Sequence, residues 1–177
     1  MIDADLIINW EWQGKEHRFD IFIADDFSHL RQVKQVYALV LSKDRANILV
    51  VKEGNGLRML PGGTVEEGET WLETLAREVK EETNRDIALE TARPLFYQLA
   101  YKKNDAGEWE FHRTEIRYSV VVENDLDFKA DPDHGKIVEA IWVPIAKLDD
   151  YLKWGETTRL IKELLQELNR KSGQFES

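Results

Sequence analysis

The chain has 177 residues, a formal net charge of −10 and no cysteine. This length suffices for one well-buried core, and no proline- or serine-rich linker divides the sequence. Without cysteine the protein forms no disulfide and performs no thiol chemistry, which favours a cytoplasmic location. Neither a signal peptide nor a membrane span is expected, because no basic start precedes an apolar run and no apolar stretch is long enough.

The excess of acidic over basic residues limits the classes of molecule that the protein is expected to bind. Binding to a nucleic-acid polymer depends on lysine and arginine, and this chain has 24 of these against 34 acidic residues. A nucleic-acid polymer is therefore not an expected partner. A small phosphorylated substrate is compatible with the charge, because a bound metal cation reverses the local electric field.

The first element expected along the chain is a β-hairpin. Residues 6–12 and 18–24 alternate in polarity on either side of residues 13–15, which form a turn sequence. We expect residues 1–30 to be an extension of the main domain, which would comprise residues 31–177.

Two tryptophans, Trp10 and Trp12, fall on one face of the first strand. They could stack on a base, cover a sheet or form the interface of a homodimer. The last two roles are favoured, because paired aromatic residues ordinarily stabilise sheets.

A second hairpin is expected where residues 36–41 and 48–52 flank the polar turn at 43–47. A short strand at 57–60 follows it. That strand runs into residues 61–63, Pro-Gly-Gly, a turn that lets the backbone approach a ligand closely.

A helix is expected to begin near Thr70, since Thr70 and Glu73 have the spacing of a capping box. Its apolar residues recur at i, i+3, i+4 and i+7 and predict a face packed on the core. These residues are Leu72, Leu75, Ala76 and Val79.

Three carboxylates of this helix, Glu78, Glu81 and Glu82, are spaced so that their side chains converge at the edge of the apolar face. Converging carboxylates repel one another unless a cation lies between them. A hard divalent ion, Mg2+ or Mn2+, fits such oxygen ligands and commonly acts on phosphate groups. An isolated acidic run is ordinarily a solvated helix face. Here the acidic run is accompanied by the glycine turn, the capping box, Glu69 and Arg77, and this combination favours a metal site.

The rest of the chain completes an α/β pattern. Strands are expected at 87–89, 95–102, 109–122 and 139–144, and the leucine and isoleucine spacing over 160–168 predicts a C-terminal amphipathic helix. Strands on both sides of a central helix indicate a sheet covered by helices.

The segment 63–85 resembles the Nudix box, G-x5-E-x7-R-E-U-x-E-E-x-G-U with U apolar. Seven of the nine specified positions match, namely Gly63, Glu69, Arg77, Glu78, Val79, Glu81 and Glu82. Asn84 stands where the family has glycine, and Arg85 stands where it has an apolar residue. Asparagine tolerates the left-handed conformation that ends a helix, and Ile87 is expected to supply the apolar contact.

The resemblance covers roughly residues 35–170 and implies a Nudix-type α/β/α sandwich with a mixed sheet. It also implies Mg2+-dependent (or Mn2+-dependent) hydrolysis of a phosphoanhydride bond in a nucleoside diphosphate linked to another group. Substrates of the family include dNTPs, ADP-ribose and dinucleoside polyphosphates. Within this class the substrate stays open: Ala100 replaces a proline typical of ADP-ribose hydrolases, and Tyr101 lies one residue from a tyrosine typical of dinucleoside polyphosphate hydrolases.

The resemblance also implies roles for individual residues. Arg77 would pair with Glu69 and brace the loop against the helix. The implied metal ligands are Glu78, Glu81, Glu82 and the backbone carbonyl of Gly62.

The general base is left open between two sources. One is a box glutamate, Glu81 or Glu82. The other is the loop before the late strand, which offers Asp131, Asp133, His134 and Glu139. We favour Glu139 among the latter because the following strand anchors it.

The resemblance raises two other possible functions. A Nudix-fold binding or regulatory module without catalysis is less favoured, since such modules typically lose box glutamates and this chain retains them. Isoprenoid diphosphate isomerisation, which some Nudix-fold enzymes perform with a catalytic cysteine, is excluded by the absence of cysteine.

Overall fold

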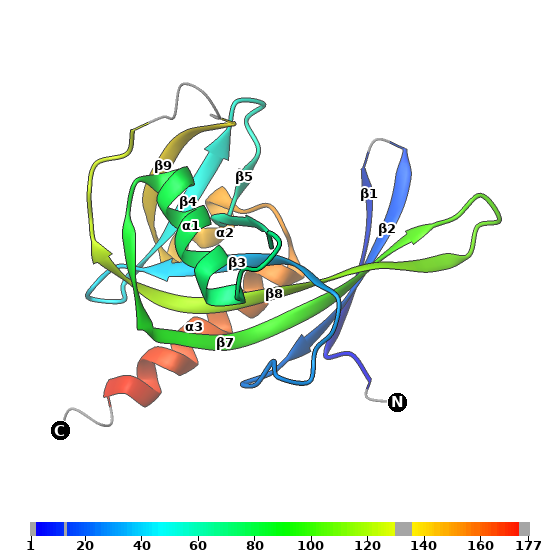
Figure 1. Cartoon of the computed structure of the whole chain (residues 1–177), viewed down its shortest axis with the longest axis horizontal. Coiled ribbons are helices and arrows are strands. Elements are labelled where there is room, and N and C mark those ends of the chain that lie inside the picture. The colour runs from blue at the N-terminus through cyan, green and yellow to red at the C-terminus, as the bar shows by residue number, and fades with distance from the viewer. Residues whose placement is uncertain (1–2, 13, 130–135, 174–177) are drawn as a thin grey trace.

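A computed structural model describes residues 3–12, 14–129 and 136–173. The strands of this part form one nine-stranded mixed sheet in the order β1-β2-β7-β8-β3-β4-β5, with β6 paired to β3 and β9 paired to β4 (Figure 1). The strands are β1 (Leu6–Trp12), β2 (Lys15–Ile23), β3 (Val33–Leu41), β4 (Asn47–Glu53), β5 (Arg58–Met59), β6 (Gly62–Thr64), β7 (Asp86–Lys103), β8 (Trp109–Asn124) and β9 (Ile137–Pro144). The helices are α1 (Trp71–Thr83), a 3-10 turn at Ile145–Lys147, α2 (Leu148–Tyr151) and α3 (Glu156–Gly173).

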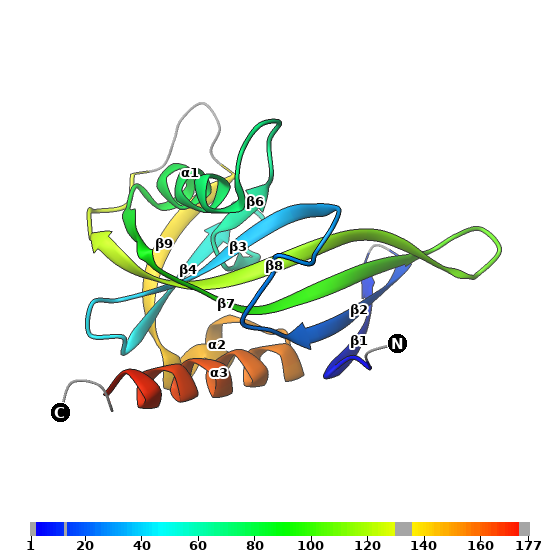
Figure 2. The ribbon, with the colours of Figure 1, turned by 60° about the horizontal axis from the view of Figure 1, so that its bottom comes forward.

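Helices cover both faces of the sheet. Helix α1 lies on one face, and α2 and α3 lie on the other, as the turned view shows (Figure 2). One apolar core fills the space between α1 and the sheet, and a second fills the space between the sheet and the C-terminal helices. The predicted α/β/α sandwich with a mixed sheet is confirmed, since β3 pairs in parallel with β8 and antiparallel with β4 and β6.

Strand β3 shows why these residues form the centre of the sheet. Its side chains alternate between the two cores, as a strand's period of two requires. Val36, Ala38 and Val40 face α1, whereas Leu39 and Leu41 face α3. A strand covered on both faces is mainly apolar, as residues 36–41 of β3 are, and β3 is paired on both edges.

The N-terminal hairpin continues the main sheet. Strand β2 pairs antiparallel with β7, from His17 opposite Lys102 to Ile23 opposite Phe96. Ile21 is 1% exposed within the core on the α3 side. The second strand begins at Lys15, three residues earlier than expected from polarity alone, and Lys15 already pairs with Trp12.

Strand β7 joins two strands that were expected separately. Ala88 pairs with Val121 and Arg93 with Ser119, so residues 89–92 of β7 lie opposite Val120 alone. This bulge accounts for the apparent break in the sequence pattern, since bulged residues leave the strand alternation.

The end of α1 explains both departures from the box pattern. Asn84 caps the helix in the left-handed conformation, with φ 57°. The buried Arg85 side chain donates from Nε to Oδ1 of Asp125 at 2.7 Å and stacks over the Trp142 ring. Ile87, 7% exposed, packs in the core on the α1 side and supplies the expected apolar contact.

Within the described ranges, no helix is both long and apolar enough to cross a membrane.

Candidate active site

Helix α1 is fixed at its start and along its apolar face. The Thr70 side chain accepts from the Glu73 backbone N–H at 3.3 Å, and Glu73 Oε2 accepts from the Thr70 backbone N–H at 2.8 Å. This confirms the predicted capping box. Leu75 and Val79 are fully buried against the sheet. With these residues buried, the edge of α1 that carries Glu78 and Glu82 lies against strand β6.

Arg77 joins the helix to the preceding loop. Its Nε and Nη2 donate to the two carboxylate oxygens of Glu69 at 2.7 and 3.0 Å, and Nη2 also donates to the Thr64 carbonyl at 3.1 Å. Its Nη1 donates to Glu78 at 3.1 Å and to Glu81 at 3.2 Å. The structure thus contains the Arg77–Glu69 pair that the resemblance implied.

Both oxygens of the Glu69 carboxylate accept hydrogen bonds from Arg77. Hydrogen bonds from Arg77 first, and then from the Thr74 hydroxyl at 2.8 Å, hold the pKa of Glu69 near 2. Glu69 is therefore an anchor for the loop, because a carboxylate so strongly stabilised in its charged form is a poor proton acceptor at neutral pH.

Glu82 occupies the most sheltered position among the three converging carboxylates. Its Oε2 accepts from the backbone N–H of Gly62 at 2.9 Å. Burial raises the pKa of Glu82 from its ordinary 4.5 to about 8, although the Gly62 bond opposes this shift; the nearby charges of Glu78 and Glu53 add to the increase.

The predicted turn at 61–63 is in part a strand, because Gly62 and Gly63 begin β6 and pair with Tyr37 and Val36. Glu78 packs directly on this glycine segment, which we call the glycine turn. A Cβ built on Gly63 would lie 2.5 Å from Oε1 of Glu78, so only glycine leaves room for this carboxylate. Burial raises the pKa of Glu78 despite the neighbouring Arg77 charge. Gly62 is also required, since its φ of 146° disfavours side chains and a Cβ there would lie 2.3 Å from the Val36 carbonyl.

These residues fit a hard divalent cation. The donors are carboxylate oxygens, and the raised pKa values of Glu78 and Glu82 show that the uncompensated charges are costly. Glu81 is more than half exposed, with 57% of its side chain accessible, and is bound by Arg77. Among the residues that the structure describes, no three acidic or histidine side chains form a ready-made cluster. Glu78 and Glu82 are thus the core of the site, and Glu81 would have to turn from Arg77 to join them.

Glu139 lies in β9 opposite Lys52 and forms an ion pair with Arg58, with 3.2 Å between Oε2 and Nη1. Arg58 also stacks over the Tyr151 ring. Its role as general base stays a prediction. The other predicted candidates, Asp131, Asp133 and His134, lie outside the described residues.

The sequence analysis did not identify Glu53 as a residue near the site. It ends β4, and its charge contributes to the raised pKa of Glu82. Its Oε2 accepts from the Asn55 side chain at 2.8 Å. The only available signal was its position at the end of an apolar strand, before a glycine-containing turn.

The sequence analysis also did not predict a buried polar network on β8. Glu115 is 3% exposed, and its carboxylate accepts hydrogen bonds at 2.7–3.0 Å from three side chains. The donors are Arg113, Arg117 and Gln98.

The Arg117 guanidinium lies 4.9 Å from the centre of the Tyr37 ring. Burial raises the pKa of Tyr37, with the charges of Glu115 and Glu82 adding to the effect. Tyr37 pairs with Gly62, so this network adjoins the glycine turn. Alternating charges at 113, 115 and 117 in an apolar strand were the available signal.

The raised pKa of Glu82 predicts how stability depends on pH. A carboxylate whose folded pKa is above its unfolded value binds more protons in the folded state, so stability falls as pH rises from 4.5 toward 8. At about 1.4 kcal/mol per pKa unit, the loss amounts to a few kcal/mol. We expect Glu82→Gln to abolish this loss in metal-free protein, as measured by urea unfolding from pH 4.5 to pH 9. Glu67→Gln, which removes an exposed charge of the same loop, is the matched control, and identical pH profiles for all three proteins would contradict the assignment.

Comparison with known proteins finds a related sequence. An uncharacterised Nudix hydrolase of Nostoc sp. is 31% identical over 98 residues, which are 55% of this chain and 52% of that protein. The match therefore spans about half the length of the relative.

Three solved structures share the fold. A pyrophosphohydrolase of Bacillus subtilis (15% identical, 77% of each chain covered), an ADP-ribose pyrophosphatase of Streptococcus suis (19%, covering 79% of this chain and 93% of that one) and an Ap4A hydrolase of C. elegans (15%, covering 80% and 99%) each superpose with a TM-score of 0.53.

The family comparison is broader. Residues 31–165 match the model of the NUDIX domain family. This range contains the braced loop, α1 and all three converging carboxylates. The chain therefore belongs to the Nudix family.

Proposed function

We propose that this protein is a metal-dependent hydrolase that cleaves a phosphoanhydride bond in a nucleoside diphosphate linked to another group. The observation that carries the proposal is the placement of Glu78 and Glu82 on the Gly62–Gly63 turn, where both pKa values are raised. Buried like charges on a turn shaped by two glycines are costly to fold and have no structural benefit of their own.

The residues proposed to hold Mg2+ or Mn2+ are Glu78 and Glu82, joined by Glu81 and the carbonyl of Gly62. A divalent cation at this position would supply Lewis acidity, neutralising charge on phosphate oxygens and activating water. The Gly62 N–H orients Glu82, and Arg77 orients Glu78. Such prior positioning matters because phosphoryl transfer depends mainly on alignment and electrostatics.

Proton transfer is proposed for Glu82 or Glu139. Glu82 has a pKa of about 8 in the metal-free site, and its Oε1 is not the oxygen engaged by the Gly62 N–H. A pKa near the working pH suits a group that takes a proton from water. Glu139 is half-exposed, and its Arg58 partner would have to release it before it could act.

The substrate class is proposed from the family and its structural neighbours. The solved relatives are named as a pyrophosphohydrolase, an ADP-ribose pyrophosphatase and an Ap4A hydrolase, and the last two names specify nucleotide-linked phosphoanhydrides.

We expect metal-dependent phosphate or nucleotide release from at least one nucleotide-linked diphosphate, in a screen with Mg2+ and Mn2+ at about pH 7.5–9. EDTA should abolish turnover, and Glu82→Gln should reduce it roughly a hundredfold, because one ligand charge is lost while the shape is kept. Glu67→Gln should retain normal rates. If no substrate is turned over with either metal, the protein is a Nudix-fold binding module instead.

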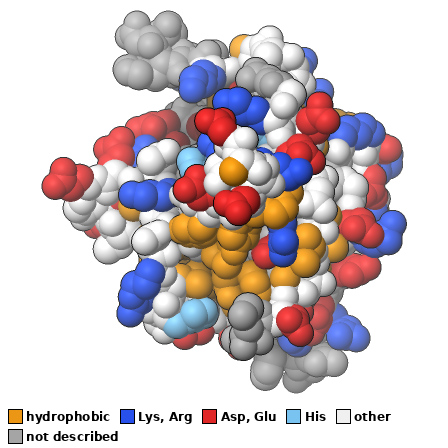
Figure 3. Space-filling model, turned by 90° about the vertical axis from the view of Figure 1, so that its right-hand side faces the viewer, with side chains coloured by type: hydrophobic (Ala, Val, Ile, Leu, Met, Phe, Trp, Pro, Cys, Tyr) orange, Lys and Arg blue, Asp and Glu red, His pale blue; other side chains and the backbone are white. Residues whose placement is uncertain are grey.

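A homodimer through the N-terminal hairpin is a second proposal. Strand β1 is the edge of the sheet, where its outer backbone groups have no strand beside them in the described residues. Large apolar side chains are exposed near this edge, including Ile7 (48%), Trp10 (51%) and Ile23 (47%). Apolar side chains gather on the side of the molecule that carries this hairpin (Figure 3). The side chain of Trp12 lies outside the described residues.

Light scattering at tens of micromolar protein tests this proposal. We expect twice the chain mass for the wild type and a monomer for the pair Ile7→Lys and Trp10→Ser, because charge and polarity at the edge oppose pairing. Deleting residues 1–25 would be less informative, since it also removes the buried Ile21. A monomeric wild type would refute the dimer.

A further inference from the structure

A cavity of about 150 Å3 opens on the α3 face of the sheet, opposite to α1. Its lining includes Leu41 of β3 and Leu168 of α3. Leu41 lies four residues beyond Tyr37, the partner of Gly62, which is about 13 Å along a strand. The cavity is therefore separate from the proposed active site, and it is far larger than one water molecule requires.

The bulge of β7 opens this cavity. Residues 89–92 leave the regular ladder between Ala88 and Arg93. The Thr91 hydroxyl repairs the ladder by accepting from the Val121 N–H at 2.9 Å and donating to the Ala88 carbonyl at 2.7 Å. Arg93 Nη1 donates to the carbonyls of Glu90 and Ala92 at 3.0 and 2.8 Å. These four hydrogen bonds hold the backbone of the bulge in one conformation.

Arg45 reaches the cavity from the turn between β3 and β4. Its φ is 57°, a left-handed conformation that such turns usually assign to glycine or asparagine. Asn169 of α3 donates to the Arg45 carbonyl at 3.0 Å and holds the turn in place. An unfavourable backbone conformation at a long cationic residue points to a role for its side chain.

Ser119 lies between the two arginines. It pairs directly with Arg93 across the sheet and is 1% exposed. Among the described residues, none forms a hydrogen bond with its Oγ. Buried hydroxyl groups nearly always have a partner, so this one indicates a ligand or ordered water in the cavity.

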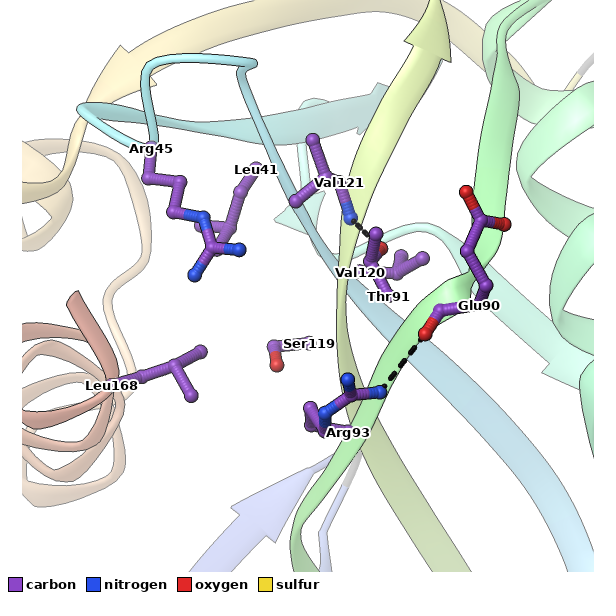
Figure 4. A pocket seen from close by; sticks show the side chains of 9 residues that line it. All are labelled: Leu41, Arg45, Glu90, Thr91, Arg93, Ser119, Val120, Val121 and Leu168. Carbon is purple, nitrogen blue, oxygen red and sulfur yellow. Dashed lines mark hydrogen bonds between the residues drawn. The ribbon is translucent and has the colours of Figure 1, made fainter. Parts of the chain in front are cut away.

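The polar lining has the composition of an anion site. Arg45 and Arg93 lie on opposite sides of the cavity with Ser119 between them, and the Glu90 carboxylate points away from both arginines (Figure 4). Guanidinium groups bind the oxygens of phosphate and carboxylate through paired hydrogen bonds, and the serine hydroxyl can donate a further one.

We propose that this cavity, formed by Arg45, Arg93 and Ser119, binds a phosphate group, either free phosphate or the phosphate of a small ester. The site does not depend on the proposed hydrolysis, because it shares no residue with the carboxylate cluster on α1.

Thermal unfolding with EDTA tests the proposal, because EDTA removes the metals that could draw phosphate to α1. Inorganic phosphate and glycerol phosphate are titrated separately, with potassium chloride holding ionic strength constant. We expect a saturable rise in Tm for the wild type. Arg93→Gln and Arg45→Gly should each raise the apparent Kd for phosphate roughly tenfold or more, because each removes a hydrogen bond to a charged group. A response to free phosphate alone identifies the ion as the ligand, and a stronger response to the ester identifies a phosphomonoester.

Two controls separate binding from folding. Arg45→Gly relieves the left-handed strain but also removes the other contacts of the side chain, so the phosphate response of each variant is measured from its own Tm without phosphate. Arg31→Gln is the matched control for Arg93, because Arg31 likewise donates to the carbonyls one and three residues before it; it should respond to phosphate as the wild type does. The proposal is overturned if phosphate raises Tm no more than chloride does, or if it stabilises the wild type, Arg45→Gly and Arg93→Gln equally.

Discussion

The bidentate pair between Arg77 and Glu69 is the interaction on which the rest of the candidate site depends. One guanidinium connects the loop carboxylate, the Thr64 carbonyl and the helix carboxylates Glu78 and Glu81. It thereby sets the distance between the glycine turn and α1. The same loop brings the Gly62 N–H to Glu82. Burial raises the pKa values of Glu78 and Glu82, and the Arg77 charge opposes the rise at Glu78.

The sequence predicted those features whose causes are local. The capping box at Thr70 and the left-handed cap at Asn84 follow from short-range backbone chemistry, and both are present. The covered sheet follows from the alternation and helical period of apolar residues. The placement of Glu78 and Glu82 on one edge of α1 follows from helix geometry alone, although their burial against the glycine turn required the fold.

Features that depend on distant partners could not be predicted in this way. Arg85 is satisfied by Asp125, forty residues away, and Glu53 influences Glu82 from another strand. The bulge that sets Arg93 opposite Ser119 depends on strand register, which no local pattern encodes. The two faces of the sheet also differ: on one face α1 carries Glu78, Glu81 and Glu82, whereas the α3 face has a cavity lined in part by Arg45 and Arg93.

The central claim is that Glu78 and Glu82 together hold a divalent cation, and Mn2+ titration followed by electron paramagnetic resonance tests it most directly. The account predicts loss of the free Mn2+ signal on addition of wild-type protein, with binding weakened at least tenfold in Glu82→Gln and in Gly63→Ala, where the added Cβ displaces Glu78. Equal Mn2+ affinity in all three proteins, each still folded, would contradict it.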